Sequence, residues 1–493
     1  MFEHITPEEA GITSARVLEY IERLERNGLA MHSVLIAKGD KLLCEAYWKP
    51  FDKDFNHRMY SQTKSYTAIA IGLLEEDGKL SLDDKIADHF PELIENELHP
   101  YMAELTIRDM LKMETTGAGA NWFNSADPDR THLYFNGQSP LYRPSTIYRY
   151  DSAGSQVLAS LVDKLAGKPM FDFMYERIFR HLGTFRNATI LKTRNGATWG
   201  DSALVCTSRD MLSFARFLMK GGVWDGKRLM NEEFIKTATS RLTDNNITGF
   251  RRYNAHGYGY QIWRWERGFG FNGMGCQYTV CVPESDLTFV CTADNQGDLG
   301  AGEVIIGGFF DCIVRPAVAK PLPADPINNR ALNELLSSLT LVTACGEPTS
   351  PIIEKINGRT YVAEQNSTGI TRFGFFFNPD GTGEFRYTNA QGDKVIYFGL
   401  GKNVFAKFPE LGYSDGFGGV RTTNGFMYDC AASAAFGTED LLQLRVQIID
   451  RYFGNMSARF GFRDDDVTVC MVKTAEDFLG AYQGTFVAHA EQE

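Results

Sequence analysis

The sequence predicts an α+β fold in its larger N-terminal part, followed by a smaller domain of antiparallel strands. Before residue 315, apolar residues at helical spacing alternate with short strand patterns, and after residue 329 alternation with a period of two dominates. Residues 316–328 are rich in proline, which is typical of a semi-rigid spacer. We therefore expect two domains, residues 1–315 and residues 329–493, joined by a linker.

The N-terminal elements begin with a helix, a hairpin and a second helix. Apolar residues at helical spacing predict the first helix around residues 17–24, and residues 33–46 have the pattern of a β-hairpin. Residues 66–74 (YTAIAIGLL) are apolar almost all round, which is typical of a helix buried in a large core. Asp77 and Gly78 are expected to end this helix.

Three more helices and a group of strands complete the first domain. A helix is expected to begin at Thr106, and amphipathic helices are expected over residues 154–166 and 208–219. Residues 257–295 contain three strand patterns, YGYQIWRW, YTVCVPE and LTFVCTA. Helices packed against an antiparallel sheet define an α+β domain.

The C-terminal domain is predicted to be a half-buried antiparallel sheet or a small barrel. Residues 370–377 and 383–387 flank a turn, and residues 442–448 and 458–462 alternate between apolar and polar. The three aspartates at residues 464–466 have no second cluster of ligands, so we interpret them as a solvated turn and not as a metal site.

Length, charge and composition narrow the class of protein. The chain has 493 residues, too many for one ordinary core. Its formal net charge of −12 argues against nucleic acid as a partner, because polyanions attract basic surfaces. We expect no membrane span, since no run of about 18 apolar residues occurs. We expect a cytoplasmic location, since the N-terminal segment lacks the apolar stretch of a secretory signal.

Cysteines and histidines form no pattern that binds a metal. The nine cysteines are scattered without a C-x-x-C spacing, so we expect reduced, buried thiols. No H-E-x-x-H occurs among the nine histidines, and we expect neither a metal nor another cofactor. His57 is expected at the surface or as a cap residue. Four aromatic residues are expected to line a pocket: Trp122, Tyr134, Phe135 and Trp263.

Ser61-Gln62-Thr63-Lys64 is a candidate catalytic motif at the start of the apolar helix. A serine hydroxyl is a weak nucleophile unless a neighbouring base takes its proton. Positions three apart share one face of a helix, so Lys64 can reach Ser61. A lysine accepts a proton only when burial or nearby positive charge favours its neutral form. The helix N-terminus also offers backbone N–H donors to a developing oxyanion.

Two later segments extend this pattern: Tyr150-Asp151-Ser152-Ala153-Gly154, and Phe271-Asn272-Gly273-Met274-Gly275. With the Ser61 motif they resemble, in order and spacing, the three active-site elements of the serine β-lactamase and penicillin-binding-protein superfamily. The resemblance is greatest to its class C-like branch, which includes esterases, D-stereospecific peptidases and 6-aminohexanoate-dimer hydrolases. It covers roughly residues 7–315 and implies a β-lactamase/transpeptidase-like fold with an antiparallel sheet, flanking helices and an all-helical region. The C-terminal part resembles the small β-barrel appendage of some members.

The resemblance implies a role for each residue that matches a motif. Ser61 would attack a carbonyl and form an acyl-enzyme, and Lys64 would share in removing its proton. Tyr150 would act as the general acid and base that carries the proton to the leaving group. Ser152 would hydrogen-bond Lys64 or the substrate amide. The backbone N–H groups of Ser61 and Met274 would form the oxyanion hole.

The third element is also expected to contact the substrate, through Phe271, Asn272, Gly273 and Gly275. Glycines there let a substrate backbone approach the strand closely. In β-lactamases and carboxypeptidases this element is Lys-Thr-Gly or begins with histidine, and the cation helps to bind a carboxylate. A phenyl ring at 271 cannot do so, and an unpaired buried charge would be costly. Penicillins and D-Ala-D-Ala are therefore disfavoured substrates.

The leading hypothesis is a serine hydrolase that cleaves a small-molecule amide, peptide or ester. One alternative is a penicillin-binding carboxypeptidase or β-lactamase in which Arg251 or Arg252 replaces the missing cation. A second alternative is a catalytically degenerate module that binds or senses a ligand on the same fold. No G-x-S-x-G motif occurs, which disfavours an α/β-hydrolase. Neither the oligomeric state nor the role of the C-terminal domain follows from the sequence.

Overall fold

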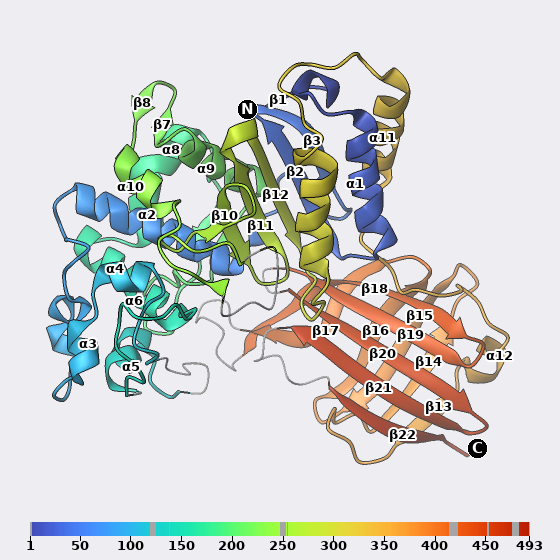
Figure 1. The fold of residues 1–493 in the computed structure, drawn as a ribbon. Helices are drawn as coiled ribbons and strands as arrows, with labels where there is room; N and C mark the ends of the chain where they lie inside the picture. The colour runs from blue at the N-terminus through green and yellow to red at the C-terminus, as the bar shows by residue number, and fades with distance from the viewer. Residues whose placement is uncertain are drawn as a thin grey trace. The chain divides into compact units, whose positions relative to one another are not determined.

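The computed structural model describes residues 2–118, 125–137, 139–246, 253, 255–413, 423–450, 453–475 and 483–492. The described chain forms two compact units that divide between Thr340 and Leu341 (Figure 1). The expected second domain began earlier, at residue 329. Residues 326–338 instead form helix α11 (Pro326–Ser338), which packs against α1 (Ser14–Arg26) in the first unit.

A seven-stranded sheet organises the first unit, with the strand order β1-β3-β2-β12-β11-β10-β9. Every neighbouring pair is antiparallel except β1 with β3. The strands are β1 (Glu3–His4), β2 (Met31–Lys38), β3 (Lys41–Tyr47), β9 (Trp263–Arg264), β10 (Phe269–Gly273), β11 (Gln277–Val282) and β12 (Leu287–Ala293). The expected hairpin over residues 33–46 is present as β2 and β3.

Helices cover both faces of this sheet (Figure 1). On one face, α1, α11 and the π-helical segments Glu303–Gly307 and Phe310–Val314 enclose a core with the apolar residues of β2, β11 and β12. On the other face, α9 (Ser208–Met219) packs against the same three strands. The other α-helices of this unit are α2 (Thr63–Glu76), α3 (Pro100–Glu104), α4 (Ile107–Leu111), α5 (Arg130–Asn136), α6 (Ser152–Ala166), α7 (Met170–Met174), α8 (Arg180–Leu182) and α10 (Glu232–Ala238).

Local sequence signals fix several of these boundaries. The predicted helix over residues 208–219 is α9, and Thr207 begins it with a capping box to Asp210. Thr106 makes the same capping box with Asp109 at the start of α4. Helix α6 begins at Ser152, two residues before its predicted start at Gly154, because Asp151 is its N-cap.

One predicted strand is largely absent. Of the segment YGYQIWRW, only Trp263–Arg264 pairs in the sheet, as β9. Gly257 and Gln261 have φ values of 107° and 53°, which an extended strand does not contain. The amide of Gly259 donates to the carbonyl of Ile262, so the chain makes a tight turn here.

Two small sheets lie outside the main one. The first has the order β4-β6-β5, with β4 (His57–Arg58), β5 (Thr189–Ile190) and β6 (Leu204–Cys206). The second pairs β7 (Val223–Trp224) with β8 (Lys227–Arg228). The first sheet matters for the site, because β4 leads into Ser61 and β6 follows the loop that contains Asp201.

The second unit is a ten-stranded, barrel-like sheet. The strand order is β16-β15-β14-β13-β22-β21-β20-β19-β18-β17, and a parallel pairing of β16 with β18 closes the sheet on itself. Phenylalanines fill its interior, as the period-two pattern predicts. The elements are α12 (Ile353–Ile356), β13 (Thr360–Ala363), β14 (Arg372–Phe377), β15 (Thr382–Asn389), β16 (Gly392–Leu400), β17 (Val404–Tyr413), β18 (Thr423–Thr438), β19 (Leu441–Ile449), β20 (Phe453–Arg463), β21 (Asp466–Ala475) and β22 (Gly484–Ala490).

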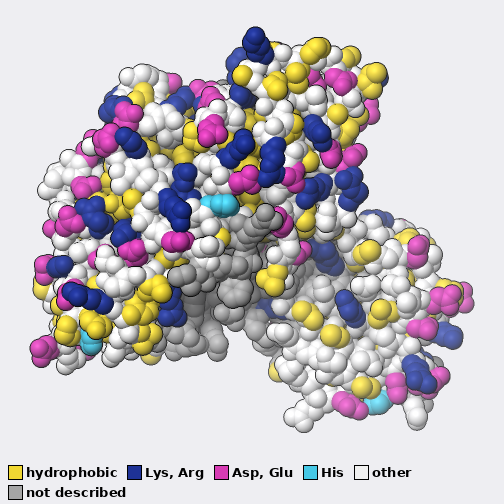
Figure 2. Space-filling model, viewed as in Figure 1, with side chains coloured by type: hydrophobic (Ala, Val, Ile, Leu, Met, Phe, Trp, Pro, Cys, Tyr) yellow, Lys and Arg dark blue, Asp and Glu magenta, His cyan; other side chains and the backbone are white. Residues whose placement is uncertain are grey.

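Figure 2 shows acidic and basic side chains interspersed over the described residues on this face. Within the described ranges, no helix is both long and apolar enough to cross a bilayer. All nine cysteines are free, and two depart from the expectation of buried thiols: Cys345 is exposed and Cys470 is half-buried.

Candidate active site

Ser61 and Lys64 meet at the start of α2. Ser61 lies in the single 3₁₀ turn Tyr60–Gln62, which runs directly into the helix. The ammonium nitrogen of Lys64 donates to the hydroxyl oxygen of Ser61 at 3.0 Å. Lys64 is 1% exposed, and Ser61 is half-buried. The spacing of three residues therefore brings the Lys64 amine into hydrogen-bonding contact with the Ser61 hydroxyl. The amine is shielded from bulk water.

The turn that holds Ser61 is strained and firmly anchored. Tyr60 has a φ of 48°, which costs energy in a residue with a large side chain and is common at functional sites. The hydroxyl of Thr63 donates to the Tyr60 carbonyl at 2.6 Å and accepts from the Leu204 amide at 3.0 Å. These bonds tie the turn to β6 and hold the Ser61 backbone at the helix N-terminus.

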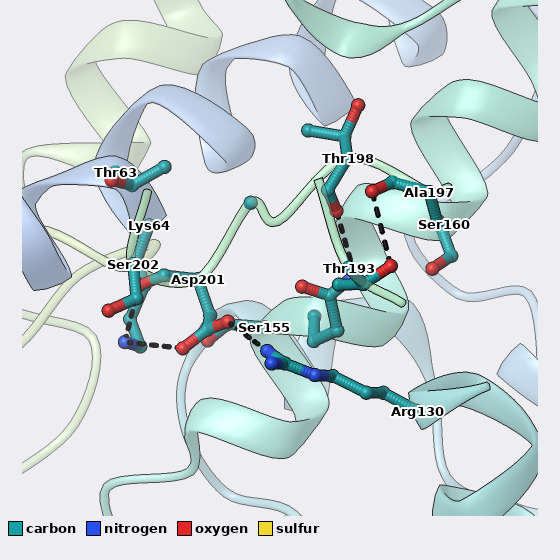
Figure 3. A network of polar contacts seen from close by, with 12 residues as sticks. Thr63, Lys64, Arg130, Ser155, Ser160, Thr193, Ala197, Thr198, Asp201 and Ser202 are labelled. Carbon is teal, nitrogen blue, oxygen red and sulfur yellow. Dashed lines mark hydrogen bonds and ion pairs between the residues drawn. The ribbon is translucent and has the colours of Figure 1, made fainter. Parts of the chain in front are cut away.

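Asp201 is the main partner of Lys64, and no sequence motif pointed to it. The Lys64 nitrogen donates to the Asp201 carbonyl at 2.7 Å and lies 3.7 Å from carboxylate oxygen Oδ2. The other carboxylate oxygen lies 3.8 Å from Nη1 of Arg130. Figure 3 shows the three side chains in one row. Because all three are buried, each charge depends on its neighbour.

Gly200 explains how the Asp201 loop reaches Lys64. The loop passes between α2 and α6, where the hydroxyl of Thr67 donates to the Gly200 carbonyl at 2.7 Å. A Cβ at residue 200 would overlap the Cβ of Ala159 on α6. The loop is held further by Thr198, whose amide and hydroxyl both donate to the Asp163 carboxylate at 2.8 Å. Only glycine fits this narrow passage.

The ring of Tyr150 also lies next to the Lys64 amine. The ring centroid is 5.1 Å from the Lys64 nitrogen, and the ring stacks on Trp263 at 5.8 Å. Asp151 fixes the backbone here, since its side chain accepts from the Gly154 amide at 3.0 Å and so caps α6. Burial raises the pKa of the Asp151 carboxyl above its ordinary value. The structure thus brings together Ser61, Lys64 and the Tyr150 ring.

Ser152 does not make the hydrogen bond to Lys64 that was one of its two expected roles. It is the first residue of α6 and is half-buried. In the described part of the chain, the Lys64 nitrogen bonds Ser61 and Asp201 and makes no bond to Ser152. The other expected role of Ser152, contact with a substrate amide, remains a prediction.

The third element packs against the segment that leads into Ser61. A Cβ on Gly273 would clash with the carbonyl oxygen of Met59, so glycine is required where β10 ends. The following turn is held by Gln277, whose side-chain amide donates to the Met274 carbonyl at 2.9 Å and to the Ala293 carbonyl at 2.7 Å. Gly275 has a φ of 81°. The expected oxyanion residue Met274 therefore lies in a rigid turn next to the nucleophile segment.

Phe271 lies in the core and not at the site. Its side chain is 0% exposed, and its ring centroid is 6.0 Å from that of Tyr66 and 5.9 Å from that of Phe214. We therefore leave Phe271 out of the proposed substrate-binding residues. Asn272, the next residue, is half-buried and points to the opposite face of the sheet, because side chains alternate along a strand.

Other sequence-based expectations have mixed outcomes. The surface position predicted for His57 is wrong: His57 is 2% exposed, and its ring nitrogen lies 2.8 Å from that of His32. Burial lowers the pKa of His57 to about 3. Tyr134 is fully buried and donates to Asp151 at 3.3 Å, so it is a core residue and does not line a pocket. Three further residues, Trp122, Arg251 and Arg252, lie outside the described residues.

Comparison with known proteins identifies the family. A model of the Beta-lactamase family matches residues 19–303, which is more than half of the chain. The chain belongs to the β-lactamase family. The predicted resemblance and the predicted fold class are both confirmed.

Named members of the family show how far this assignment extends. The chain is 22% identical to the 6-aminohexanoate-dimer hydrolase of Paenarthrobacter ureafaciens over 259 residues, which are 48% of this chain and 64% of that enzyme. The match thus spans just under two thirds of that relative. The chain is also 24% identical to the D-aminopeptidase of Brucella anthropi over 223 residues, covering 36% of this chain and 42% of that enzyme.

A solved structure extends the likeness to both units. The octameric penicillin-binding protein homologue from Pyrococcus abyssi has a TM-score of 0.50 and 16% identity, and the match covers 96% of this chain and 99% of that chain. At this identity the comparison shows the fold alone. Taken together, the relatives are serine hydrolases of the β-lactamase family.

Proposed function

We propose that the chain is a serine hydrolase that cleaves a small amide, peptide or ester through an acyl-enzyme on Ser61. The observation that carries the proposal is the contact of 3.0 Å between the buried amine of Lys64 and the hydroxyl of Ser61. A hydroxyl held against a cation ionises more readily and becomes a competent nucleophile. The relatives named 6-aminohexanoate-dimer hydrolase and D-aminopeptidase support the reaction class.

In the proposed reaction, the oxygen of Ser61 attacks the substrate carbonyl carbon while the hydroxyl proton passes to Tyr150, which acts as the general base. The backbone N–H groups of Ser61 and Met274 stabilise the resulting oxyanion. The carbon–nitrogen or carbon–oxygen bond then breaks, and the leaving group takes up the proton. Water hydrolyses the acyl-enzyme by the reverse sequence, which returns the proton to Ser61.

The burial of Phe271 bears on the substrate. This residue stands where penicillin-recognising relatives carry a cation, and its ring is enclosed by Tyr66 and Phe214. A substrate carboxylate would find no partner at that position. The proposed substrate therefore presents no carboxylate to this position, and it is not a penicillin or a D-Ala-D-Ala peptide.

Turnover of a substrate panel tests the proposal. The panel contains short acyl esters, D-aminoacyl amides and 6-aminohexanoate oligomers, and the matched control is Ser81→Ala, which changes an exposed serine of the same unit. We expect hydrolysis of at least one class, loss of that activity in Ser61→Ala and full activity in Ser81→Ala. Equal turnover by Ser61→Ala would refute the mechanism. Ligand-stabilised melting without turnover would favour a binding module, and labelling by a fluorescent penicillin would favour the carboxypeptidase alternative.

A further inference from the structure

The buried row Lys64–Asp201–Arg130 reaches beyond the sequence motifs, which contain only Lys64 of these three residues. The exposed fractions are 1% for Lys64, 3% for Asp201 and 6% for Arg130. Each oxygen of the carboxylate faces one cation, at 3.7 Å and 3.8 Å. A buried ion is costly unless it is paired, so the three charges depend on one another. Figure 3 shows that the row ends on the Lys64 amine, and this amine donates to the hydroxyl of Ser61.

The side chains around this row are contributed by several elements. Lys64 comes from α2, and the ring of Tyr150 lies beside its amine from the segment before α6. Arg130 is the first residue of α5, and its guanidinium lies over the ring of Trp199 at 4.6 Å. Arg58 of β4 lies over the same ring at 4.5 Å. Asp201 is an anionic group paired with two of these cations, Lys64 and Arg130.

We propose that Asp201 is a positioning residue for acyl transfer, which pairs with Lys64 and keeps its amine directed at Ser61. Arg130 holds the carboxylate in place. An ammonium group has three donors; two are used by Ser61 and the Asp201 carbonyl, and the carboxylate attracts the same nitrogen. Lys64 then acts through its charge and its hydrogen bond to the nucleophile. This inference rests on the proposed function of Ser61.

The pH dependence of Ser61 modification distinguishes this role from simple support of the fold. The rate of labelling by a fluorophosphonate is measured from pH 5 to 11 alongside the melting temperature. If charged Lys64 promotes the reaction, the rate declines at alkaline pH as Lys64 loses its proton. Asp201→Asn removes the anion beside Lys64, so the alkaline decline should move to lower pH. Its labelling should also slow by about 100-fold, as expected when a reacting group is misplaced.

Two further variants complete the test: one is a control, and the other should shift the alkaline decline in the opposite direction. Asp163→Asn loosens the same loop through Thr198 without touching Lys64, so it should lower the melting temperature and leave the alkaline decline in place. Arg130→Met removes a cation from the row, so the decline should move to higher pH. An unchanged pH profile in Asp201→Asn, or the same shift in Asp163→Asn, would overturn the inference. If Asp201→Asn does not fold, the upward shift in Arg130→Met decides the question.

These measurements distinguish an error in the role of Asp201 from an error in the proposed function of Ser61. If the wild-type chain is not labelled at all, the proposed nucleophile itself is wrong. If the wild-type chain is labelled and neither Asp201→Asn nor Arg130→Met moves the pH profile, only the role of Asp201 is wrong.

Discussion

Replacing Gly200 by alanine should disturb the site through one added methyl group. The new Cβ would lie 2.2 Å from the Cβ of Ala159, whereas two carbon atoms in ordinary contact are about 3.5–4.0 Å apart. The loop and α6 must therefore separate by about 1.5 Å. Overpacking of this kind costs about 1–3 kcal/mol of unfolding free energy.

The displacement should reach the chemistry, because Asp201 follows Gly200 and bonds Lys64. A misplacement of about 1 Å can slow a reaction by about 100-fold. We expect Gly200→Ala to lower the free energy of unfolding in urea and to slow the labelling of Ser61 by a fluorophosphonate. Both effects are measured on the same purified variant.

A compensating change on α6 provides the control. Ala159→Gly removes the opposing methyl group, and alone it should cost about 1 kcal/mol because glycine disfavours a helix interior. In the double variant Gly200→Ala/Ala159→Gly, the tightest remaining contact of the new Cβ is with the hydroxyl of Thr67 at 3.1 Å. We expect labelling to recover, with a coupling free energy above about 1 kcal/mol. Simply additive losses in the double variant would refute the steric reasoning.

Three further predictions concern Tyr150, His57 and Phe271. Tyr150→Phe should lower kcat/KM by about 10²–10⁴-fold with little change in melting temperature, because it removes only the proton-transfer group; an unaltered kcat/KM would contradict this. Since burial lowers the pKa of folded His57 from 6.5 to about 3, the unfolded chain binds the extra proton between these values, and stability should rise with pH across that window by about 1.4 kcal/mol per unit. His57→Gln should reduce this slope in urea unfolding measured from pH 5 to 7, and an unchanged slope would exclude His57 as its source. Phe271→Ala should lower the unfolding free energy by about 3–5 kcal/mol and leave KM unchanged, because its ring contacts Tyr66 and Phe214 and no substrate; a raised KM at full stability would show the reverse.

Features set by neighbouring residues were predictable from the sequence. The contact of Lys64 with Ser61 follows from their spacing of three on one helix, and helix α9 follows from its apolar spacing and its cap at Thr207. The alternating strands of the second unit follow from their period of two. In each case local geometry alone places the side chains.

Features set by distant parts of the chain were not predictable in this way. Asp201 joins the site only because the loop around Gly200 fits between α2 and α6, and no local pattern encodes that passage. His57 is buried because β4 pairs with β6, far along the chain. Phe271 occupies the position of a familiar motif, yet its neighbours in the core decide that it contacts no substrate.

The central claim is that Ser61 is the nucleophile, and peptide mass mapping tests it most directly. The chain is treated with a fluorophosphonate, digested, and searched for the phosphonyl adduct. We expect a single modified peptide, the one that contains Ser61, and much slower modification of the same peptide in Lys64→Met, since that variant removes the contacting amine. An adduct on a different residue, or none on Ser61 at saturating reagent, would contradict the account.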